Sequence, residues 1–429
     1  MKLFWQLFYN ILILPGLFVL SLISSLFIPK VREGLKGRWE SIKILKDFFS
    51  QNKNCRLVYW FHSASLGEYE QIRPILSGLK EVENDCICVV SFFSPSGYDH
   101  VKDDNIDCKI YLPFDFIWNC IRALKIVNPT KLIFAEYDVW PNFVWCAEKL
   151  NITTTLFSAR IHSKSKKNLP LIKNFYKHFY RCINFIYTIS YRDYSGIRTL
   201  LANNGSGKSL IKVLGNPRYD SVKQSADKYT QERTKSLINR PSRLIAGSVW
   251  PDDENVILTP LVEIMNKYDD LQLYWVPHEP YNKYIDKSLK SFGSRGFKAK
   301  LFSDCKNGEL DTTRLVLVDK VGILSRLYWK GKFAYIGGGF SKGIHNVMEP
   351  AMARLPVIMG PKYYNSDAAE ELVNNGGGYP ITQDTEFFNI VTKFLDNKEF
   401  YLKSSIAATD VIHQNIGSST RVVRGIIRD

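Results

Sequence analysis

The stretch RLVYWFHSASLGEYEQIRPILSGLKEVENDCICVVSFF, residues 56–93, decides the fold. Its two ends, residues 56–61 and 87–93, are short apolar runs rich in β-branched and aromatic residues, which is typical of buried strands. Between them, apolar residues recur at helical spacing, at Tyr69, Ile72, Leu76 and Leu79. A strand–helix–strand unit of this kind predicts a parallel sheet.

The same alternation continues along the chain in two series. The first series has further strand-like runs at 131–135 and 153–157, and the second has them at 243–246, 271–276, 315–319, 333–336 and 357–359. Residues 216–243 between the series are polar and rich in lysine, so we interpret them as a junction. We therefore predict two doubly wound α/β domains that face a cleft, with ligands at the carboxyl ends of the strands.

An apolar segment precedes both series. Residues 3–29 contain no charged side chain, and about 20 helical residues are enough to cross a hydrocarbon core. Basic residues follow the segment, at Lys30, Arg32, Lys36 and Arg38, which predicts that the rest of the chain is cytoplasmic. Because Pro15 and Gly16 could break the helix, a segment that lies in the membrane interface stays an alternative to a spanning one.

The composition excludes several classes of protein. The chain has 429 residues, of which 45% are hydrophobic, so it is not a disordered protein. Its eight cysteines include no CxxC pair, which leaves no disulfide scaffold or zinc ribbon to propose. The charge sum, 57 − 42 = +15, favours an anionic partner such as a membrane surface, a phosphorylated substrate or a nucleic acid.

Small residues follow the first predicted strand, in the sequence HSASLGE (62–68). Glu68, at the start of the predicted helix, has two interpretations. It is either a first-turn carboxylate that complements the helix dipole or a general base that takes a proton from an acceptor hydroxyl. The spacing alone favours the first interpretation.

A second acidic stretch, EYDVWPN (136–142), follows the strand predicted at 131–135. Glu136 and Asp138, two residues apart at a strand end, are placed to perform acid–base chemistry or to hold a cation. A polar turn before a helix that begins at Pro141 explains them equally well. Arg160 follows the next strand and adds a guanidinium suited to a carboxylate or phosphate.

The second series carries glycine-rich turns at its strand ends. Residues 246–248 are AGS, 337–339 are GGG, and 343–350 are GIHNVMEP. A glycine loop that leads into a helix N-terminus is suited to a nucleotide phosphate, with Glu349 accepting hydrogen bonds from ribose hydroxyls. The structural alternative is that Asn346 and Glu349 form a helix capping box, because they also have its spacing.

Other motifs are absent or misleading. Residues 204–209, NGSGKS, resemble the end of a P-loop, but Ala202 replaces its first glycine and a helix rather than a strand precedes it. The chain contains no D-x-D triplet, and its histidines have no metal-ligand spacing, so we expect no metal site.

Further short motifs occur in a distinctive order. They are SPSGY (94–98), YLPFD (111–115), SARIHSKS (158–165), GNPRYD (215–220) and GPKYYN (360–365). With the N-terminal segment and the motifs above, the chain resembles the membrane-anchored 3-deoxy-D-manno-octulosonic acid (Kdo) transferases of lipid A assembly. The resemblance implies an α/β GT-B fold of two Rossmann-like domains. After an anchor at 1–30, residues 31–215 would bind the acceptor and 216–429 the CMP-sugar, with the C-terminal helix able to pack back on the first domain.

The resemblance also implies a role for individual residues. Glu68 matches the catalytic base of the family, and Glu136 and Arg218 match residues that stabilise the transition state. Asp138 replaces a second Glu of the family motif, and Arg218 stands where the family usually has Lys. The implied CMP-binding residues are Ser248, Pro277, His278, Val321, Gly322, Ile323, Gly338, Gly339, His345, Asn346, Val347, Met348 and Glu349. Two of them depart from the family pattern, because His278 replaces an Arg and Ile323 replaces a Glu.

The implied activity is inverting transfer of Kdo from CMP-Kdo to a lipid A precursor (lipid IVA) at the cytoplasmic face of the inner membrane. No cofactor, metal or nucleic acid is expected. The net charge fits an anionic glycolipid, and Lys164, Lys166 and Lys167 are candidate headgroup contacts, although a solvated surface explains such a run as well. The departures at His278 and Ile323 favour, as one alternative, a GT-B enzyme that uses another nucleotide sugar for a surface glycan. A silent, membrane-bound nucleotide-binding protein is the other alternative, and the presence of Glu68 and Glu349 argues against it.

Overall fold

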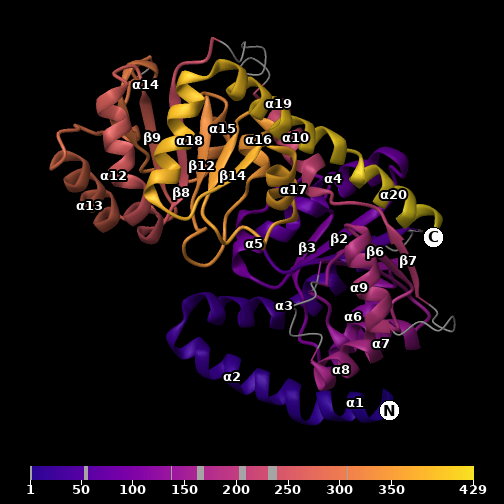
Figure 1. The fold of residues 1–429 in the computed structure, drawn as a ribbon. Helices are drawn as coiled ribbons and strands as arrows, with labels where there is room; N and C mark the ends of the chain where they lie inside the picture. The colour runs from indigo at the N-terminus through magenta and orange to yellow at the C-terminus, as the bar shows by residue number, and fades with distance from the viewer. Residues whose placement is uncertain are drawn as a thin grey trace. The chain divides into compact units, whose positions relative to one another are not determined.

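The chain divides into two compact units in the computed structural model, which describes residues 2–52, 57–136, 138–161, 169–201, 209–229, 239–306 and 308–429. Unit 1 comprises Met1–Ser221 and Gly417–Asp429, and unit 2 comprises Val222–Ile416. Each unit is built around a parallel sheet, as the sequence predicts, and each sheet has seven strands (Figure 1). Lys164, Lys166, Lys167 and most of the P-loop-like stretch lie outside the described residues.

The sheet of unit 1 has the strand order β3-β2-β1-β4-β5-β6-β7. Its strands are β1 (Val58–Ser63), β2 (Ile87–Phe92), β3 (Cys108–Tyr111), β4 (Lys131–Ala135), β5 (Thr153–Ala159), β6 (Phe185–Thr188) and β7 (Leu210–Val213). The helices around it are α4 (Leu66–Val82), α5 (Pro95–His100), α6 (Ile117–Val127), α7 (Pro141–Lys149), α8 (Pro170–Tyr180), α9 (Tyr191–Leu201) and α20 (Ser418–Arg428).

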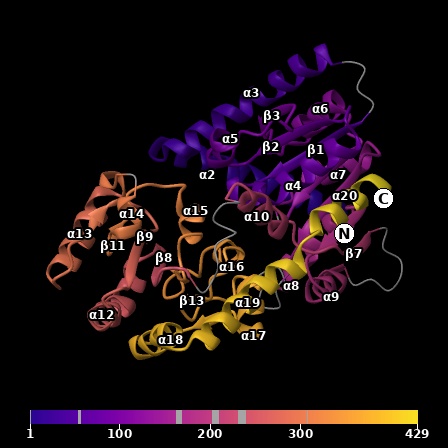
Figure 2. The same cartoon turned by 90° about the horizontal axis from the view of Figure 1, so that it is seen from above.

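Both faces of this sheet are covered by helices, because alternate side chains of each strand enter different cores. Trp60 and Val89 pack in one core with apolar side chains of α6, α7, α8 and α9. Tyr59 and Val90 point to the opposite core, where α4 and the C-terminal helix α20 lie together (Figure 2). Burial on both faces explains why β1 and β2 are continuous apolar runs rather than alternating ones.

Four helical segments precede β1. They are α1 (Lys2–Phe8), a π-helical turn η1 (Tyr9–Ile13), α2 (Leu14–Phe27) and α3 (Pro29–Gln51). The apolar residues form a continuous helix from Lys2 to Phe27 through Pro15 and Gly16, so these two residues do not end the helix. In Figure 1, α3 runs back alongside α2.

The sheet of unit 2 has the strand order β10-β11-β9-β8-β12-β13-β14. Its strands are β8 (Arg243–Val249), β9 (Gln272–Pro277), β10 (Lys300–Leu301), β11 (Leu315–Leu317), β12 (Phe333–Ile336), β13 (Val357–Met359) and β14 (Gly378–Pro380). The helical segments are α10 (Arg218–Asp227, shared by both units), α12 (Pro251–Lys267), α13 (Asn282–Gly293), η3 (Phe302–Asp304), α14 (Glu309–Thr312), α15 (Leu324–Tyr328), α16 (Met348–Met352), α17 (Asp367–Asn375), α18 (Asp384–Asp396) and α19 (Lys398–Asn415).

Every strand predicted from the sequence is present, within a few residues of its predicted bounds. The strands that the sequence analysis did not predict are β3, β6, β7, β10 and β14, each of two to four residues. Such short runs have no detectable periodicity, and each forms a strand by pairing with a neighbouring strand. For example, β10 pairs with β11, and β14 pairs with β13.

Candidate active site

The first group of candidate residues lies at the carboxyl ends of the two central strands of unit 1. Strand β1 pairs with β2 on one side and with β4 on the other, so the chain reverses its winding direction between β1 and β4. His62 is opposite Phe134 in this pairing. The turns that follow β1 and β4 therefore meet at the point where open α/β sheets bind ligands.

Glu68 lies in the first turn of α4. This helix begins at Leu66, two residues before the predicted start, because Ser65 is its N-cap. The Ser65 hydroxyl accepts a hydrogen bond from the Gly67 backbone N–H at 3.3 Å and donates one to Glu68 Oε2. The carboxylate is half-buried, so its first-turn position leaves it accessible to a substrate.

Glu136 is the buried carboxylate of the site, with 3% of its surface exposed. Its Oε1 accepts a hydrogen bond from Gln71 Nε2 at 2.5 Å and lies 3.7 Å from Arg218 Nη2. The same Arg218 nitrogen donates to the Gly67 carbonyl oxygen at 3.0 Å. One guanidinium thus joins Glu136 to the turn that carries Glu68, and the three predicted catalytic residues come together.

Asp138 has a different partner from Glu136. Its Oδ2 is 2.9 Å from His62 Nε2, and His62 Nδ1 is 3.0 Å from the Ser91 hydroxyl. The His62 side chain is fully buried, whereas that of Asp138 is 25% exposed. Although Glu136 and Asp138 are two residues apart, they are held by separate networks rather than acting on one shared partner. His62 was assigned no role in the sequence analysis.

Non-glycine residues with positive φ angles end strands in both units. Glu136 has φ +57°, Ser158 at the end of β5 has φ +52°, and Ser248 at the end of β8 has φ +54°. Such residues cost about 1 to 3 kcal/mol each and cluster at functional sites. Arg160 lies two residues beyond Ser158, directly after β5.

Asp253 organises the second group of candidate residues, in unit 2. It is fully buried at the start of α12, and its Oδ2 accepts from the backbone N–H groups of Gly338 at 2.7 Å and Trp250 at 2.9 Å. Its Oδ1 accepts from the Tyr335 hydroxyl at 2.8 Å. Neither Asp253 nor Trp250 was among the predicted residues. Asp253 lies in a first turn with two other acidic residues, and the sequence does not distinguish it from them.

The glycines after β12 allow close approach of backbone segments. A Cβ on Gly339 would be 2.6 Å from the Gly360 Cα, and one on Gly337 would be 2.2 Å from the Ser248 carbonyl oxygen. Gly338 has φ +93°, and its carbonyl oxygen accepts from the Gly343 N–H at 2.9 Å. The GGG sequence is therefore required by packing between turns, which is a structural reason for a motif that we also assign to phosphate binding.

Three aromatic rings stack at the same edge of the sheet. The ring centroid of His278 lies 4.3 Å from that of Trp250 and 4.3 Å from that of His345. Trp250 Nε1 donates to His345 Nε2 at 2.9 Å, so this nitrogen is unprotonated. Burial and, to a smaller extent, the nearby His278 lower the pKa of His345 to about 4. Burial also lowers the pKa of His278.

The remaining nucleotide candidates of unit 2 lie on two helix starts. Asn346 Oδ1 accepts from the Met348 N–H at 2.9 Å, but the N-cap of α16 is Val347, so Asn346 does not occupy the position that the predicted capping box requires. Val321 is 77% exposed, Gly322 has φ +81°, and Ile323 is the N-cap of α15. Glu349 lines a small pocket with Ser325 and Trp329, which brings the two helix starts together.

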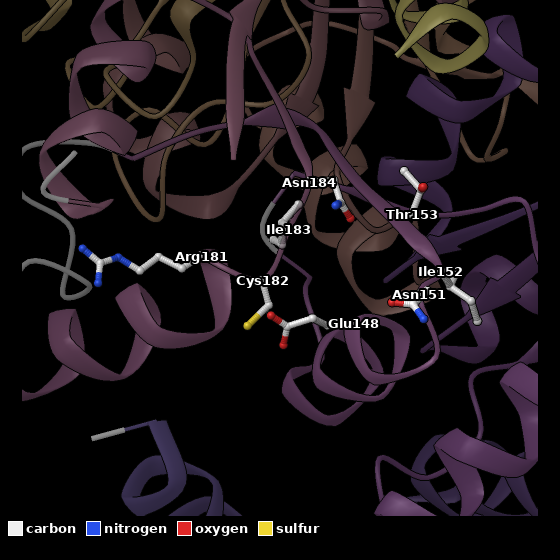
Figure 3. A pocket seen from close by; sticks show the side chains of 8 residues that line it. All are labelled: Glu148, Asn151, Ile152, Thr153, Arg181, Cys182, Ile183 and Asn184. Atoms are coloured by element: carbon white, nitrogen blue, oxygen red, sulfur yellow. The ribbon is translucent and has the colours of Figure 1, made fainter. Parts of the chain in front are cut away.

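A larger pocket in unit 1, of about 210 Å³, lies away from the predicted residues (Figure 3). It includes Thr153 at the start of β5, so it is at the amino ends of the strands. Figure 3 shows Glu148 beside Cys182, while the side chain of Arg181 extends away from them. Across the described parts of the chain, no group of three His, Cys, Asp or Glu residues is arranged to hold a metal ion.

The chain is similar to known proteins along most of its length. Residues 36–221 match the family model described as 3-deoxy-D-manno-octulosonic-acid transferase (kdotransferase). A 3-deoxy-D-manno-octulosonic acid transferase from Aquifex aeolicus (strain VF5) is 29% identical over 364 residues, which are 83% of this chain and 92% of the relative. One from Haemophilus influenzae is 26% identical over 431 residues, which are 98% of this chain and 97% of the relative.

These similarities confirm the resemblance predicted from the motifs. Among solved structures, UDP-GlcNAc 2-epimerase from Neisseria meningitidis, bound to UDP-GlcNAc, aligns with a TM-score of 0.60 and 13% identity. The alignment covers 87% of this chain and 100% of the epimerase. At this identity the likeness concerns the fold alone, and it supports the predicted GT-B architecture.

Proposed function

We propose that this glycosyltransferase, a relative of the Kdo transferases, moves Kdo from CMP-Kdo to a phosphorylated lipid A precursor at the inner membrane. The observation that carries the proposal is the position of Arg218, whose guanidinium contacts Gly67 in the Glu68 turn and Glu136 after β4. The similarity to Kdo transferases over most of the chain supports the identity of the sugar.

In this proposal Glu68 is the general base. Its carboxylate takes the proton of an acceptor hydroxyl while the hydroxyl oxygen forms a bond to the anomeric carbon of Kdo. The bond from that carbon to the phosphate oxygen breaks, and CMP leaves with the electron pair. Because attack and departure occur on opposite faces, the anomeric centre is inverted.

Arg218 and the backbone groups supply positive potential for this step. Arg218 is 34% exposed, so it is able to face a negatively charged substrate while it stays fixed by Glu136 and Gly67. In unit 2 the helix starts after Asn346 and Ile323 would direct backbone N–H groups to the CMP phosphate, whereas the Gly338 N–H is bound to Asp253. We expect that the transfer needs no metal ion or other cofactor.

The N-terminal helix fits a membrane location. The helix Lys2–Phe27 is long and apolar enough to cross a membrane, with a mean hydropathy of 2.1 in its most apolar window and 6% of that window buried. We propose that it holds the enzyme at the cytoplasmic face of the inner membrane, where the glycolipid acceptor resides.

The experiment uses the full-length protein in detergent with a CMP-Kdo-generating system and a tetraacylated lipid A precursor. Mass spectrometry follows the gain of Kdo units by wild type, Glu68→Gln and Glu81→Gln, the last being an exposed carboxylate at the end of the same helix. We expect transfer by wild type and Glu81→Gln and a loss of about 10²- to 10⁴-fold in Glu68→Gln. Equal rates in all three proteins would contradict the assignment of the base.

One observation favours a second candidate function. His278, stacked between Trp250 and His345, lacks the permanent charge of the Arg that the family has at this position. A GT-B enzyme that transfers a different nucleotide-linked sugar would fit this change. If CMP binds but the lipid A precursor gains no Kdo with wild type, a panel of other nucleotide sugars would be tested next.

A further inference from the structure

The length of the N-terminal helix does not decide how it meets the membrane. Its 26 residues would extend about 39 Å at 1.5 Å per residue, more than the roughly 30 Å of a hydrocarbon core. A helix of this length is able to span the bilayer or to lie in its plane. The two arrangements differ in whether its ends lie on the same side of the membrane.

The first half of the helix is docked on the globular part of unit 1. The Tyr9 hydroxyl donates to Asp115 Oδ2 at 2.8 Å, and the Asn10 and Asn142 side chains exchange two hydrogen bonds, of 3.0 and 2.8 Å. Lys2 forms an ion pair with Glu148. These polar contacts are specific, because each joins a side chain of the apolar segment to a partner more than 100 residues away.

Apolar contacts continue the docking along the helix. The ring of Trp5 lies 5.7 Å from that of Phe175 on α8, and Leu14 is buried in the core of unit 1. Phe18 makes edge contacts with Phe114 at 5.3 Å and with Phe116 at 5.4 Å. The helix is thus held to the surface of the domain from Lys2 to Phe18.

The π-helical turn η1 keeps these contacts on one face. Trp5 and Tyr9 are four residues apart, Tyr9 and Leu14 are five apart, and Leu14 and Phe18 are four apart. A regular α-helix would rotate Leu14 away from the domain, and the wider turn over Tyr9–Ile13 restores its position. Pro15, which has no backbone N–H, follows directly, so the irregular turn coincides with a missing helical hydrogen bond.

Helix α3, which follows the apolar helix, returns to the same part of the domain. After Phe27 the chain turns into α3, where Ser41 Oγ donates to the Tyr111 carbonyl oxygen at 2.7 Å. Trp39 of α3 lies 4.9 Å from Phe114, the residue that Phe18 also contacts. Phe18 of the apolar helix and two residues of α3, Trp39 and Ser41, therefore all contact residues 111–116.

We propose that the Lys2–Phe27 helix lies in the plane of one membrane leaflet, with both of its ends on the side of the globular domain, and does not cross the bilayer. The proposal rests on the membrane association stated under the proposed function. A spanning helix would either draw Asp115, Asn142 and Glu148 into hydrocarbon or break the contacts that join them to the apolar helix. Placing such polar groups in hydrocarbon costs several kcal/mol each.

The surface of the helix fits a leaflet with anionic headgroups. Its outward side chains are large and apolar, and they are Leu3, Phe4, Leu7, Ile11, Leu12, Leu17, Val19, Leu20, Ile23, Leu26 and Phe27. Next to this apolar surface, α3 exposes Lys36 and Lys43 together with Trp39, which is 64% exposed. In the arrangement proposed here, the apolar side chains of the helix enter the acyl layer of the leaflet, and the basic and aromatic side chains of α3 reach its headgroups.

A tag experiment on the full-length protein tests the topology. A protease-cleavable tag is placed before Met1 in one protein and after Asp429 in another, and both are expressed in cells whose inner membrane is isolated as inverted or right-side-out vesicles. We expect protease added outside to remove both tags in inverted vesicles and neither in right-side-out vesicles. Removal of the N-terminal tag only in right-side-out vesicles would overturn the in-plane arrangement and leave membrane association intact. Recovery of the protein in the soluble fraction would instead overturn membrane association itself.

A depth measurement provides an independent readout. Leu12, Val19 and Leu26 are seven residues apart and all exposed, so labels at these positions share one face of the helix. A spin label on a genetically encoded amino acid avoids the eight native cysteines. We expect the three labels to lie at the same depth in vesicles of mixed neutral and anionic lipids. In a spanning helix the outer two would be separated by about 21 Å along the axis, which would contradict the proposal.

Charge reversal of the basic residues beside the apolar helix tests whether they contact anionic lipid. The triple variant Lys30→Glu, Lys36→Glu and Lys43→Glu should bind anionic vesicles at least 10-fold more weakly and neutral vesicles equally well. Lys283→Glu, Lys290→Glu and Lys298→Glu, all in unit 2, serve as the matched control. Equal loss in both triple variants would show that net charge, and not the surface beside the helix, determines binding.

Discussion

The two units have similar parallel sheets, but different kinds of residues lie at the carboxyl ends of their central strands. In each, a seven-stranded parallel sheet reverses its winding direction at two central strands, β1 and β4 in unit 1 and β8 and β12 in unit 2. At this point unit 1 presents the carboxylates Glu136 and Asp138, which side chains hold in place. Unit 2 presents a glycine turn and stacked rings, and its carboxylate Asp253 is buried beneath them.

The difference agrees with the roles proposed for the two units, catalysis in unit 1 and nucleotide binding in unit 2. A general base that removes a proton is a charged side chain. Such a side chain keeps a fixed position only when charged or polar partners hold it. A phosphate is bound well by backbone N–H groups, and these become available when glycine lets the chain approach closely. At the carboxyl ends of its central strands, unit 1 carries charged side chains held by polar partners, whereas unit 2 carries glycines in close backbone contact beside stacked rings.

The largest effect should come from the arginine of unit 1. Arg218→Ala should lower kcat by about 10²- to 10³-fold, because it removes a fixed positive charge beside Glu136 and the Glu68 turn. Arg218→Lys should recover part of the rate, since it keeps the charge but loses the two-sided contact. Steady-state kinetics with CMP-Kdo and lipid A precursor measure the rates, and Arg122→Ala, an exposed arginine of α6, is the control. A rate loss accompanied by an equal loss of CMP affinity would break the assignment of catalysis to unit 1.

The buried carboxylate of unit 2 should affect stability and binding rather than chemistry. Asp253→Asn exchanges a charged acceptor of three hydrogen bonds for an amide, which should lower the unfolding free energy of unit 2 by about 2 to 3 kcal/mol. Hydrogen exchange resolves this effect by unit, and calorimetry follows CMP binding. The neighbouring Asp252→Asn is exposed and should change neither. If the two variants behave alike, Asp253 does not organise the turn.

Substitution of two glycines with similar φ angles distinguishes the cost of a positive φ from the cost of a steric clash. Gly338→Ala should cost about 2 kcal/mol, because φ is +93° and the new Cβ would lie 2.4 Å from the Gly343 carbonyl oxygen. Gly322→Ala should cost about 1 kcal/mol, because φ is +81° but nothing lies within 4 Å of the new Cβ. Denaturant unfolding measures both. Equal costs would contradict the close packing of the glycine turn.

The smallest expected effect is the contribution of His345 to the pH dependence of the unfolding free energy. Its pKa is lowered from 6.5 to about 4 in the folded protein, so between these values the unfolded chain binds a proton that the folded chain does not. The unfolding free energy should therefore fall as pH decreases from 6.5 towards 4, by on the order of 1 kcal/mol after allowance for partial exposure. His345→Gln keeps an acceptor for Trp250 and should remove this dependence in thermal unfolding at pH 7 and pH 5. A dependence unchanged by the substitution would point to other groups.

The sequence predicts the long, regular features of the fold well. The strands of unit 1 around residues 56–93 and the helix between them follow from hydrophobic periodicity, because burial on both faces selects continuous apolar runs. The short strands β3 and β10 do not follow from hydrophobic periodicity, because they depend on pairing with a neighbour that the sequence does not identify. Motif order is a stronger predictor of the candidate site than any single motif, because GGG and HSASLGE each have a structural explanation.

What the sequence by itself determined is the class of the protein: two parallel α/β units, an apolar N-terminal helix, and residues similar to those of Kdo transferases. Each of these depends on local periodicity or on short motifs, which are properties of neighbouring residues. The tertiary structure alone decided that Arg218 contacts both Gly67 and Glu136, that Asp253 holds the Gly338 turn, and that Tyr9 docks on Asp115. These contacts join residues from 82 to 151 positions apart in the chain, and only the folding of distant segments against one another brings them into contact.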